Sequence, residues 1–434
     1  MKKIPLKNPI DVDPLVKAAF DREKWWSRLS FWAAALILGL VSVFFAAICD
    51  WSNHVFQEIY AFSPFAPFLV CPLGFLLVIM IQRRFFPGAE GSGTPQVIAS
   101  LQSGSTLLKN KLLSIRILCG KILGAFLGLL FGASIGREGP SIHIGASLFH
   151  ALGHFAQFSR TDRRRGLIVA GAAAGLSAAF NAPLAGIVFA IEELKGSFED
   201  RSSGLMLSAI ILAGLISLAL LGHYTYFGEV DVALKGLESG LVIIVISVMG
   251  GLSGGLFSRM ILYWSPIFQG WQKKRWWLVP IVLGLVIAAI GFVSNGQSFG
   301  TGYEQTRALL DDSEVSKSLF PFWKFLATFF SYMTGIAGGV FAPSLSIGAS
   351  LGTLVAPLFP LEEIKALIVL GMVAFLAAVI RAPITSFVIV FEMTSNHFLL
   401  LPLMACSFIS AGVSKLVSEK PLYRGLADQY LKQE

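Results

Sequence analysis

Charged side chains are scarce in this chain. They make up 14% of its 434 residues, whereas a soluble globular protein carries about 25%. Apolar residues make up 55%, and the mean hydropathy is +0.72. This balance excludes an ordinary water-soluble domain. It predicts an all-α protein that crosses a membrane several times, because a helix satisfies its own backbone hydrogen bonds in lipid.

Cysteine is scarce too, as are the patterns that hold metals. The four cysteines lie singly in apolar stretches, with no CxxC pair and no Cys/His spacing, which excludes a disulfide framework and a zinc site. The six histidines are scattered along the chain. No nucleophile–base constellation and no phosphate-binding lysine motif is present. We therefore expect no enzymatic activity, no metal and no organic cofactor.

The net charge of +8 does not indicate a nucleic-acid partner. The basic runs 160–165 and 273–275 lie between apolar stretches, as cytoplasmic loops do under the positive-inside rule. The first 28 residues carry seven Lys and Arg residues, and the acidic residues among them argue against a cleaved signal peptide. We expect both termini in the cytoplasm, the lipid bilayer as a partner, and no nucleic acid.

Eight apolar runs are long enough to predict membrane-spanning helices, since about 20 residues cross the hydrocarbon core. Seven further runs are shorter or broken by Gly or Pro. Such partial helices are tolerated where they are buried or line a binding site. The long runs are 30–49, 60–82, 113–134, 203–222, 236–258, 276–294, 318–340 and 398–417. The short runs are 92–101, 140–155, 166–180, 183–194, 343–358, 364–380 and 383–395.

Two internal repeats divide the chain into halves. PSIHIGASL from Pro140 matches PSLSIGASL from Pro343 at seven of nine positions, at an offset of 203. Residues 167–192 match 367–392 at 11 of 26 positions, at an offset of 200. The sequence leaves open whether the repeats are parallel or inverted, although short broken helices in matching positions favour inversion.

The repeats predict the domain organisation. A cytoplasmic N-terminal segment, in which residues 12–28 form an interfacial amphipathic helix, precedes two membrane repeats joined by a polar linker. The expected boundaries are 1–29 for the N-terminal segment, 30–222 for the first repeat, 223–235 for the linker, 236–425 for the second repeat and 426–434 for the cytoplasmic C-terminal tail.

Three glycine-rich turns open short helices at a proline: GSGTP at Pro95, GREGP at Pro140 and GVFAP at Pro343. Proline suits the first helical position, where the N–H has no partner. Glycine allows a ligand to approach the backbone closely. The free N–H groups and the helix dipole make each helix start weakly positive without a formal charge. One such turn is ordinary helix capping, but three of them favour an anion site, to which the Ser92 hydroxyl adds a donor.

Three acidic residues stand in apolar surroundings. The carboxylate of Glu138, in the GREGP turn, can occupy the same pocket as an anion, and protonation would release it; the alternative is a structural ion pair with Arg137 or Lys121. Glu192 and Glu193 end an apolar helix. Adjacent carboxylates disfavour joint ionisation, which suits a proton entry point. The alternative, in which both side chains extend to the membrane–water interface without a role in proton transfer, explains the pair equally well.

These residues resemble the CLC family of chloride channels and chloride/proton antiporters over nearly the whole chain. GSGTP is similar to the family's GSGIP, GREGP to its G(K/R)EGP and GVFAP to its GIFAP, and KPLY before Arg424 resembles the segment with the pore tyrosine. The resemblance implies the CLC fold, an all-α polytopic membrane protein with two inverted-topology helical repeats and several broken or partial transmembrane helices. It also implies a homodimer with one pore per subunit.

The resemblance implies a set of chloride ligands. A central ion would be bound by two hydroxyls and two backbone N–H groups, and an outer ion would lie near two small residues. The central ligands are Ser92, Tyr423, Val340 and Phe341, and the outer site lies near Gly139 and Ala342.

The resemblance also implies roles for charged residues. Glu138 would be the gate that alternates with the anion at the outer site. Glu193 would be the internal proton-transfer residue, and Glu192 would assist access to it. Lys121 and Arg137 would support the electrostatics of the site.

We therefore expect a chloride/proton antiporter of a prokaryotic inner membrane. A passive chloride channel of the same fold is the alternative, and Glu193 argues against it because channel members generally lack an acid there. Ser92 favours chloride over nitrate, because nitrate-preferring relatives carry proline at this position. Thr94 and Gln96 depart from the family pattern. Eleven residues follow Tyr423, so we expect none of the nucleotide-sensing domains of eukaryotic relatives.

Overall fold

The computed structural model describes residues 22–155, 161–194, 203–222, 225–234, 238–312, 319–359 and 364–432. These residues form helices, and the β-structure among them is limited to an isolated bridge. The all-α prediction is confirmed. The amphipathic helix expected at 12–28 lies mostly outside the described residues, and its last residues belong to α2, which begins at Arg22.

Each predicted run corresponds to a helix, although α2 and α11 extend well beyond the predicted 30–49 and 236–258. The first half contains α2 (Arg22–Phe62), α3 (Pro67–Phe85), α4 (Thr94–Gln102), α5 (Thr106–Leu112), α6 (Ile115–Leu130), α7 (Glu138–Phe155), α8 (Thr161–Phe180), α9 (Pro183–Glu192) and α10 (Ser203–Leu221). The second half contains α11 (Glu238–Lys274), α12 (Leu278–Val293), α13 (Tyr303–Asp312), α14 (Phe320–Met333), α15 (Phe341–Val355), the 3₁₀ helix η1 (Ala356–Leu358), α16 (Ile364–Ile380), α17 (Pro383–Thr394), α18 (Leu400–Val417) and α19 (Leu422–Leu431).

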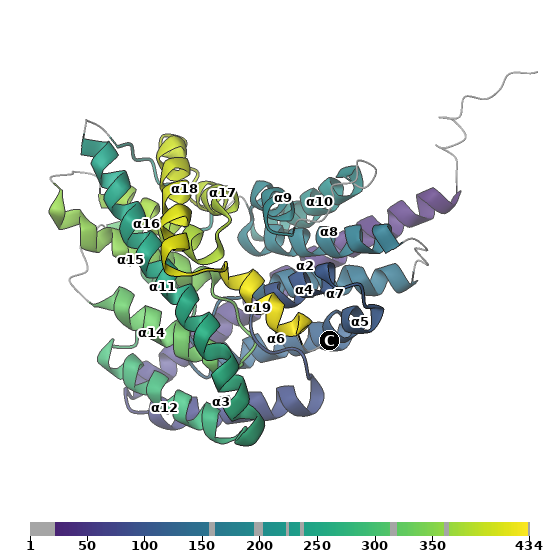
Figure 1. The fold of residues 1–434 in the computed structure, drawn as a ribbon, viewed down its shortest axis with the longest axis horizontal. Helices are drawn as coiled ribbons and strands as arrows, with labels where there is room; N and C mark the ends of the chain where they lie inside the picture. Colours follow the sequence, from purple (N-terminus) through teal and green to yellow (C-terminus); the bar gives the residue numbers. More distant parts are fainter. Residues whose placement is uncertain are drawn as a thin grey trace, which may run out of the picture.

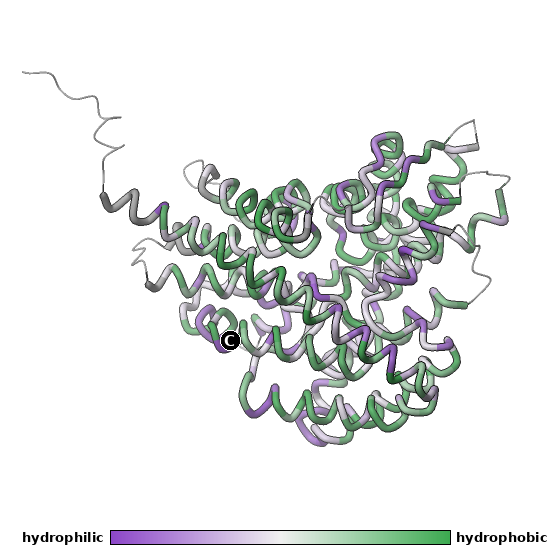
Figure 2. Tube along the Cα trace, turned by 180° about the vertical axis from the view of Figure 1, so that it is seen from behind, coloured by the Kyte–Doolittle hydropathy of each residue, from purple (hydrophilic) through white to green (hydrophobic). Residues whose placement is uncertain are grey.

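Figure 1 shows how the halves meet: α3 and α12 lie together at one end of the molecule, and α19 reaches from the second half to α4. Six of the described helices are long and apolar enough to cross a membrane. Hydrophobic residues run along most of the helices, and many large ones are exposed on α2, α3, α11 and α18 (Figure 2). Apolar surface on this scale requires a lipid environment. The chain is a multi-pass membrane protein.

Some helix lengths differ from the prediction. The runs 276–294 and 318–340 form α12 and α14, of 16 and 14 residues, which are shorter than a full crossing. Conversely, α15 and η1 together are long enough to cross. The helices α5, α13 and α19 were not predicted, because they are short and carry many polar residues.

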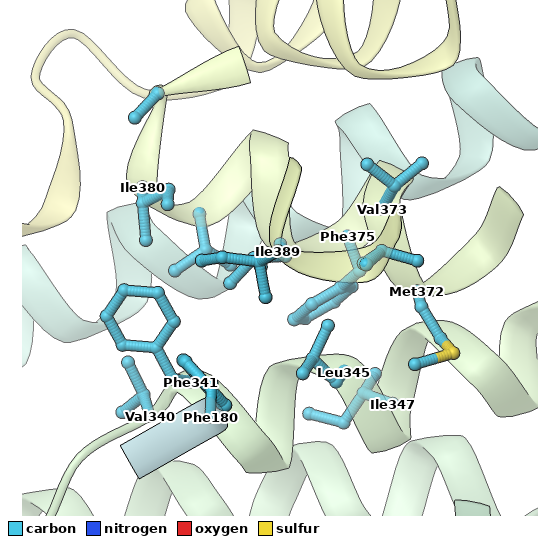
Figure 3. Close-up of a cluster of buried hydrophobic side chains, with 14 of the residues drawn as sticks. Phe180, Val340, Phe341, Leu345, Ile347, Met372, Val373, Phe375, Ile380 and Ile389 are labelled. Atoms are coloured by element: carbon cyan, nitrogen blue, oxygen red, sulfur yellow. The ribbon is translucent and has the colours of Figure 1, made fainter. Parts of the chain in front are cut away.

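The core is built from helices that are apolar on every side. All residues of α16 from Ala366 to Ile380 are buried, as expected for a helix without a polar face. Figure 3 shows Leu345 and Ile347 of α15 facing Met372 and Phe375 of α16. A similar contact joins α7 to α8 in the first half.

Glycines allow both of these helix pairs to cross closely. A side chain at Gly145 would collide with the carbonyl of Gly171, and one at Gly348 would collide with the carbonyl of Gly371. The four glycines are related by the repeat offsets of 203 and 200. Small residues at helix crossings let backbones approach in membrane proteins. The same crossing is therefore used once in each half.

The halves are related by an inverted repeat. Gly136 and Gly339, which are equivalent in the repeats, form an antiparallel bridge in which each N–H donates to the other carbonyl at 2.7 Å. Equivalent segments that run antiparallel are what an inverted repeat requires. The turns before α9 and α17 also match, because Asn181 and Arg381 both adopt the left-handed conformation with φ 53°.

Candidate functional site

The three glycine-rich turns predicted from the sequence meet in the interior. The N–H of Gly338 donates to the carbonyl of Gly91 at 3.1 Å, and the Gly136–Gly339 bridge joins the other two turns. Each turn leads into a short helix, namely α4, α7 and α15. Three helix starts, with their free N–H groups, therefore converge between the two halves.

The helices begin slightly earlier than predicted. Pro140 and Pro343 were expected at the first helical position, but α7 begins at Glu138 and α15 at Phe341, so each proline is the third residue of its helix. Pro95 is the second residue of α4. The reasoning still holds, because N–H groups throughout the first turn lack an intrahelical acceptor.

The GSGTP turn is fixed by two polar side chains. The buried Lys121 Nζ donates to the carbonyls of Glu90 and Gly91, at 3.0 and 2.7 Å. Gln96 accepts from the Gly93 N–H at 3.1 Å and donates to the Glu90 carbonyl at 2.6 Å. The predicted role of Lys121 in the electrostatics of the site stays a prediction. Gln96, which departs from the family pattern, caps the start of α4.

Glu138 lies at the centre of the convergence. Its side chain is fully buried, and its Oε2 accepts from the N–H of Ala342, in the first turn of α15, at 3.4 Å. Its Oε1 has no hydrogen-bond partner among the described residues. The first turn of α7, in the first half, thus supplies the carboxylate, and the first turn of α15, in the second half, supplies the N–H donor.

The alternative of a structural ion pair for Glu138 is not what the structure contains. The nearest candidate, Arg137, pairs instead with Asp50 at 2.6 Å and donates to the carbonyl of Ala46 at 3.0 Å. Lys121 is committed to backbone carbonyls. In the described part of the chain, no cation lies within ion-pair distance of Glu138, and the hydrogen bond that its carboxylate accepts comes from the backbone N–H of Ala342.

Two unpaired hydroxyls lie beside this carboxylate. Ser92 Oγ and Tyr423 OH are both buried, and neither has a hydrogen-bond partner among the described residues. A side chain at Gly139 would collide with Ser92 Oγ, which shows how closely the two turns approach. Buried donors without partners are costly unless a ligand satisfies them.

Aromatic rings close one side of the site. The Phe341 ring lies 5.7 Å from the Tyr423 ring and 6.0 Å from the Phe180 ring, measured between centroids. Val340 and Phe341 are both buried at the start of α15, beside Phe180 (Figure 3). The N–H groups of Val340 and Phe341 therefore belong to the converging helix starts. All six predicted anion-binding residues are brought together.

Glu193 lies at a second location. Its side chain is buried, with Oε1 unpartnered among the described residues. It borders a cavity of about 120 Å³, lined also by Ile98, Leu101, Gln102, Leu194 and Arg424. The cavity lies at the C-terminal end of α4, whose N-terminal end forms the GSGTP turn. One short helix thus connects the two locations.

Glu192 points elsewhere. Its carboxylate accepts from the N–H groups of Ile384 and Thr385 in the first turn of α17, at 3.1 and 2.6 Å. Glu392, its equivalent in the repeat, accepts from the N–H groups of Leu184 and Ala185 in the first turn of α9, at 3.0 and 2.7 Å. The two acids are reciprocal caps across the interface between the halves. The predicted role of Glu192 in proton access stays a prediction.

Several residues of the site were missed from the sequence. Asp50 became visible only through its contact with Arg137, and Gln96 was noted from the sequence as a departure from the family pattern but not as the cap of α4. Lys324 donates to the carbonyls of Ser298, Phe299 and Gly300, at 3.1, 3.2 and 2.7 Å. It stands 203 residues after Lys121, so the repeat offset could have found it. Among the described residues, no group of His, Cys, Asp and Glu could hold a metal ion.

Comparison with known proteins gives consistent results. A family described as voltage gated chloride channel matches residues 74–415. The H(+)/Cl(-) exchange transporter ClcA of Klebsiella pneumoniae is 30% identical over 445 residues, covering 96% of this chain and 92% of the relative. The transporter of the same name from Salmonella typhi is 30% identical, covering 94% and 90%.

Solved structures share the fold. A slow cyanobacterial Cl-/H+ antiporter has a TM-score of 0.82 and 27% identity, covering 94% of this chain and 98% of its own. A CLC-type fluoride/proton antiporter has a TM-score of 0.77 and 22% identity, covering 91% and 97%. The second likeness supports the fold alone.

Proposed function

This chain belongs to the CLC family of voltage-gated chloride channels, and from that premise we propose that it exchanges chloride for protons across a membrane. One observation carries the proposal: the buried Glu138 carboxylate accepts a hydrogen bond from a backbone N–H of the opposite half and forms no ion pair with a described residue, since Arg137 pairs with Asp50 instead. The relatives named as H(+)/Cl(-) exchange transporters support the same conclusion.

The chloride ligands are dipoles rather than full charges. We assign the central ion to the hydroxyls of Ser92 and Tyr423 with the N–H groups of Val340 and Phe341. The outer ion lies at the N–H groups near Gly139 and Ala342. Helix starts attract anions without a formal positive charge. Such binding is weak enough for an ion to leave again, as transport requires.

Glu138 and the outer ion compete for one place. As a carboxylate, Glu138 occupies the first turn of α15 and excludes chloride. Protonation removes its charge, and with it most of the attraction to the helix start. The neutral side chain leaves, and chloride takes its place. Proton binding and chloride movement are coupled because one position serves both.

The proton and the anion follow separate paths on the inner side. We assign proton exchange to Glu193, which borders its own cavity, while chloride passes the hydroxyls of Ser92 and Tyr423. Helix α4 packs against α19, and both helices contribute residues to the cavity beside Glu193. Arg137 and Lys121 do not contact the ion in this scheme: Arg137 is tied to Asp50, and Lys121 holds the GSGTP turn.

The rival functions have less support. A passive channel needs no buried acid at position 193, whereas Glu193 is buried beside a polar cavity. A membrane enzyme that uses Glu192 and Glu193 as a pair is disfavoured, because Glu192 is committed to the start of α17.

We also propose a location and an assembly. The basic residues near both ends support cytoplasmic termini under the positive-inside rule. Residence in a prokaryotic inner membrane and assembly as a homodimer with one pore per subunit rest on the family resemblance. Bound chloride ions are the only non-protein groups the function requires.

Proton flux in liposomes tests the proposal. A chloride gradient imposed on the wild-type protein should drive protons uphill. Glu138→Ala should retain anion flux but lose proton movement, and Glu193→Gln should lose proton coupling too. Glu58→Gln, which changes an exposed acid, is the matched control and should behave as wild type. Chloride flux without proton movement in the wild-type protein would identify a channel.

A further inference from the structure

The cavity beside Glu193 contains a cation that the proposed function does not use. Arg424 lines the cavity together with Glu193 and Gln102. The cavity volume of about 120 Å³ accommodates several water molecules. Three polar side chains in its wall provide the partners that such water needs. The unpartnered Oε1 of Glu193 is the buried group that lacks a ligand there.

Arg424 and the pore tyrosine are consecutive residues of α19. Neighbouring residues of a helix project about 100° apart, so the two side chains leave α19 in different directions. Tyr423 is buried at the anion site, whereas Arg424 is exposed and borders the cavity. Helix α19 therefore presents an anion ligand to one path and a positive charge to the other.

Few charged groups of the described residues act on Glu193. Arg424 and Glu192 are the two that influence it electrostatically, and the Tyr423 hydroxyl is a further titratable group nearby. Glu192 is held by the first turn of α17. Arg424 forms no ion pair with another described residue, so its charge is available to Glu193 through the cavity.

We propose that Arg424 is a positioning residue for proton exchange, which favours the ionised form of Glu193 and so sets the internal pH range over which the exchanger works. The inference rests on the proposed chloride/proton exchange. A positive charge near a carboxylate makes its protonation harder. The effect is moderate, because Arg424 is exposed to solvent, which screens its charge. Glu193 then releases a captured proton readily to the cavity.

The test is the dependence of chloride-driven proton flux on the pH of the compartment that faces Glu193, measured in liposomes. Arg424→Gln removes the charge, so Glu193 keeps its proton to higher pH. The midpoint of the pH profile should rise by about half a unit to one unit. Arg424→Lys keeps the charge and should retain the wild-type midpoint.

Two controls separate this role from a general effect of charge or structure. Lys432→Gln removes a positive charge from the exposed end of the same helix and should leave the midpoint unchanged. In a Glu193→Gln background, where the responding group is absent, Arg424→Gln should have no further effect on the pH dependence of chloride flux.

The outcomes are distinguishable. If wild-type protein moves protons but Arg424→Gln keeps the wild-type midpoint, the role of Arg424 is refuted and the exchange function stands. The same holds if Arg424→Lys moves the midpoint as far as Arg424→Gln does. If the wild-type protein moves no protons at all, both proposals fail.

Discussion

The reciprocal caps of α9 and α17 give a sharp prediction about Glu192. Its carboxylate accepts two backbone hydrogen bonds from α17 and a third from the Thr385 hydroxyl, at 2.8 Å. Glu392 accepts two from α9. Glu192→Gln keeps the length of the side chain but removes its charge and one of its acceptor oxygens. Glu392→Gln makes the same change at the equivalent position.

The expected loss follows from the number and kind of hydrogen bonds. A bond to a charged group contributes about 1.5–3 kcal/mol, against about 0.5–1.5 kcal/mol for a neutral one. The negative charge at the helix start adds about 0.3–1 kcal/mol. Both acids are half-buried, so solvent reduces these values, and each variant should lose about 1–2 kcal/mol of stability. This corresponds to a fall in Tm of a few degrees.

Thermal unfolding in detergent, followed by tryptophan fluorescence at one fixed scan rate, measures this loss. Glu192→Gln and Glu392→Gln should lower Tm by similar amounts and leave proton coupling intact. Glu193→Gln should have the opposite pattern, with coupling lost and Tm unchanged, because its buried oxygen has no partner to lose. If Glu192→Gln keeps the wild-type Tm and abolishes coupling, Glu192 serves proton access and the capping argument is refuted.

Three further changes test other parts of the structure. Tyr423→Phe removes an unpaired hydroxyl, so Tm should hold while chloride affinity, measured by calorimetry, falls about three- to tenfold; an unchanged affinity would exclude the hydroxyl as a ligand. Lys324→Met leaves three buried carbonyls unsatisfied and should cost about 2–4 kcal/mol, seen as a lower Tm that exposed Lys273→Met does not share. Gly145→Ala drives a methyl group into the backbone of α8 and should lower the free energy of unfolding by about 1–3 kcal/mol. Gly240→Ala, whose added methyl group would have no neighbour within 4 Å, should leave stability unchanged. If the two variants have the same Tm, the close crossing of α7 and α8 is contradicted.

The sequence predicted those parts of the fold that depend on local composition. Apolar runs located most of the helices, and the repeat offsets located equivalent turns. Helix α19 was missed because only ten residues form it and several of them are charged or polar. It is nevertheless central to the site, since it carries both Tyr423 and Arg424. Hydropathy detects contact with lipid, and α19 packs against other helices instead.

The candidate site was predictable to the extent that its chemistry is local. Each glycine-rich turn indicated a helix start with free N–H groups, and Glu138 stood out as an acid in apolar surroundings. The contacts of Glu192 and Glu392 were not predictable in this way. The match of these two acids at an offset of 200 was visible in the sequence. The capping contacts, however, require that the C-terminal end of α9 lies beside the start of α17, and that the C-terminal end of α17 lies beside the start of α9. That arrangement is a property of the packed halves.

The twofold relation between the halves is broken at the position that matters most. Phe341 occupies the place in the second repeat that Glu138 occupies in the first, 203 residues earlier. Its ring packs against Phe180 and Tyr423, so the second half contributes a fixed apolar wall and a backbone donor. A carboxylate in both places would put two like charges in one buried site, which disfavours ionisation of both. Because Glu138 is the acid at this position and faces the apolar Phe341 ring, its protonation alone decides whether the start of α15 binds the Glu138 carboxylate or the anion.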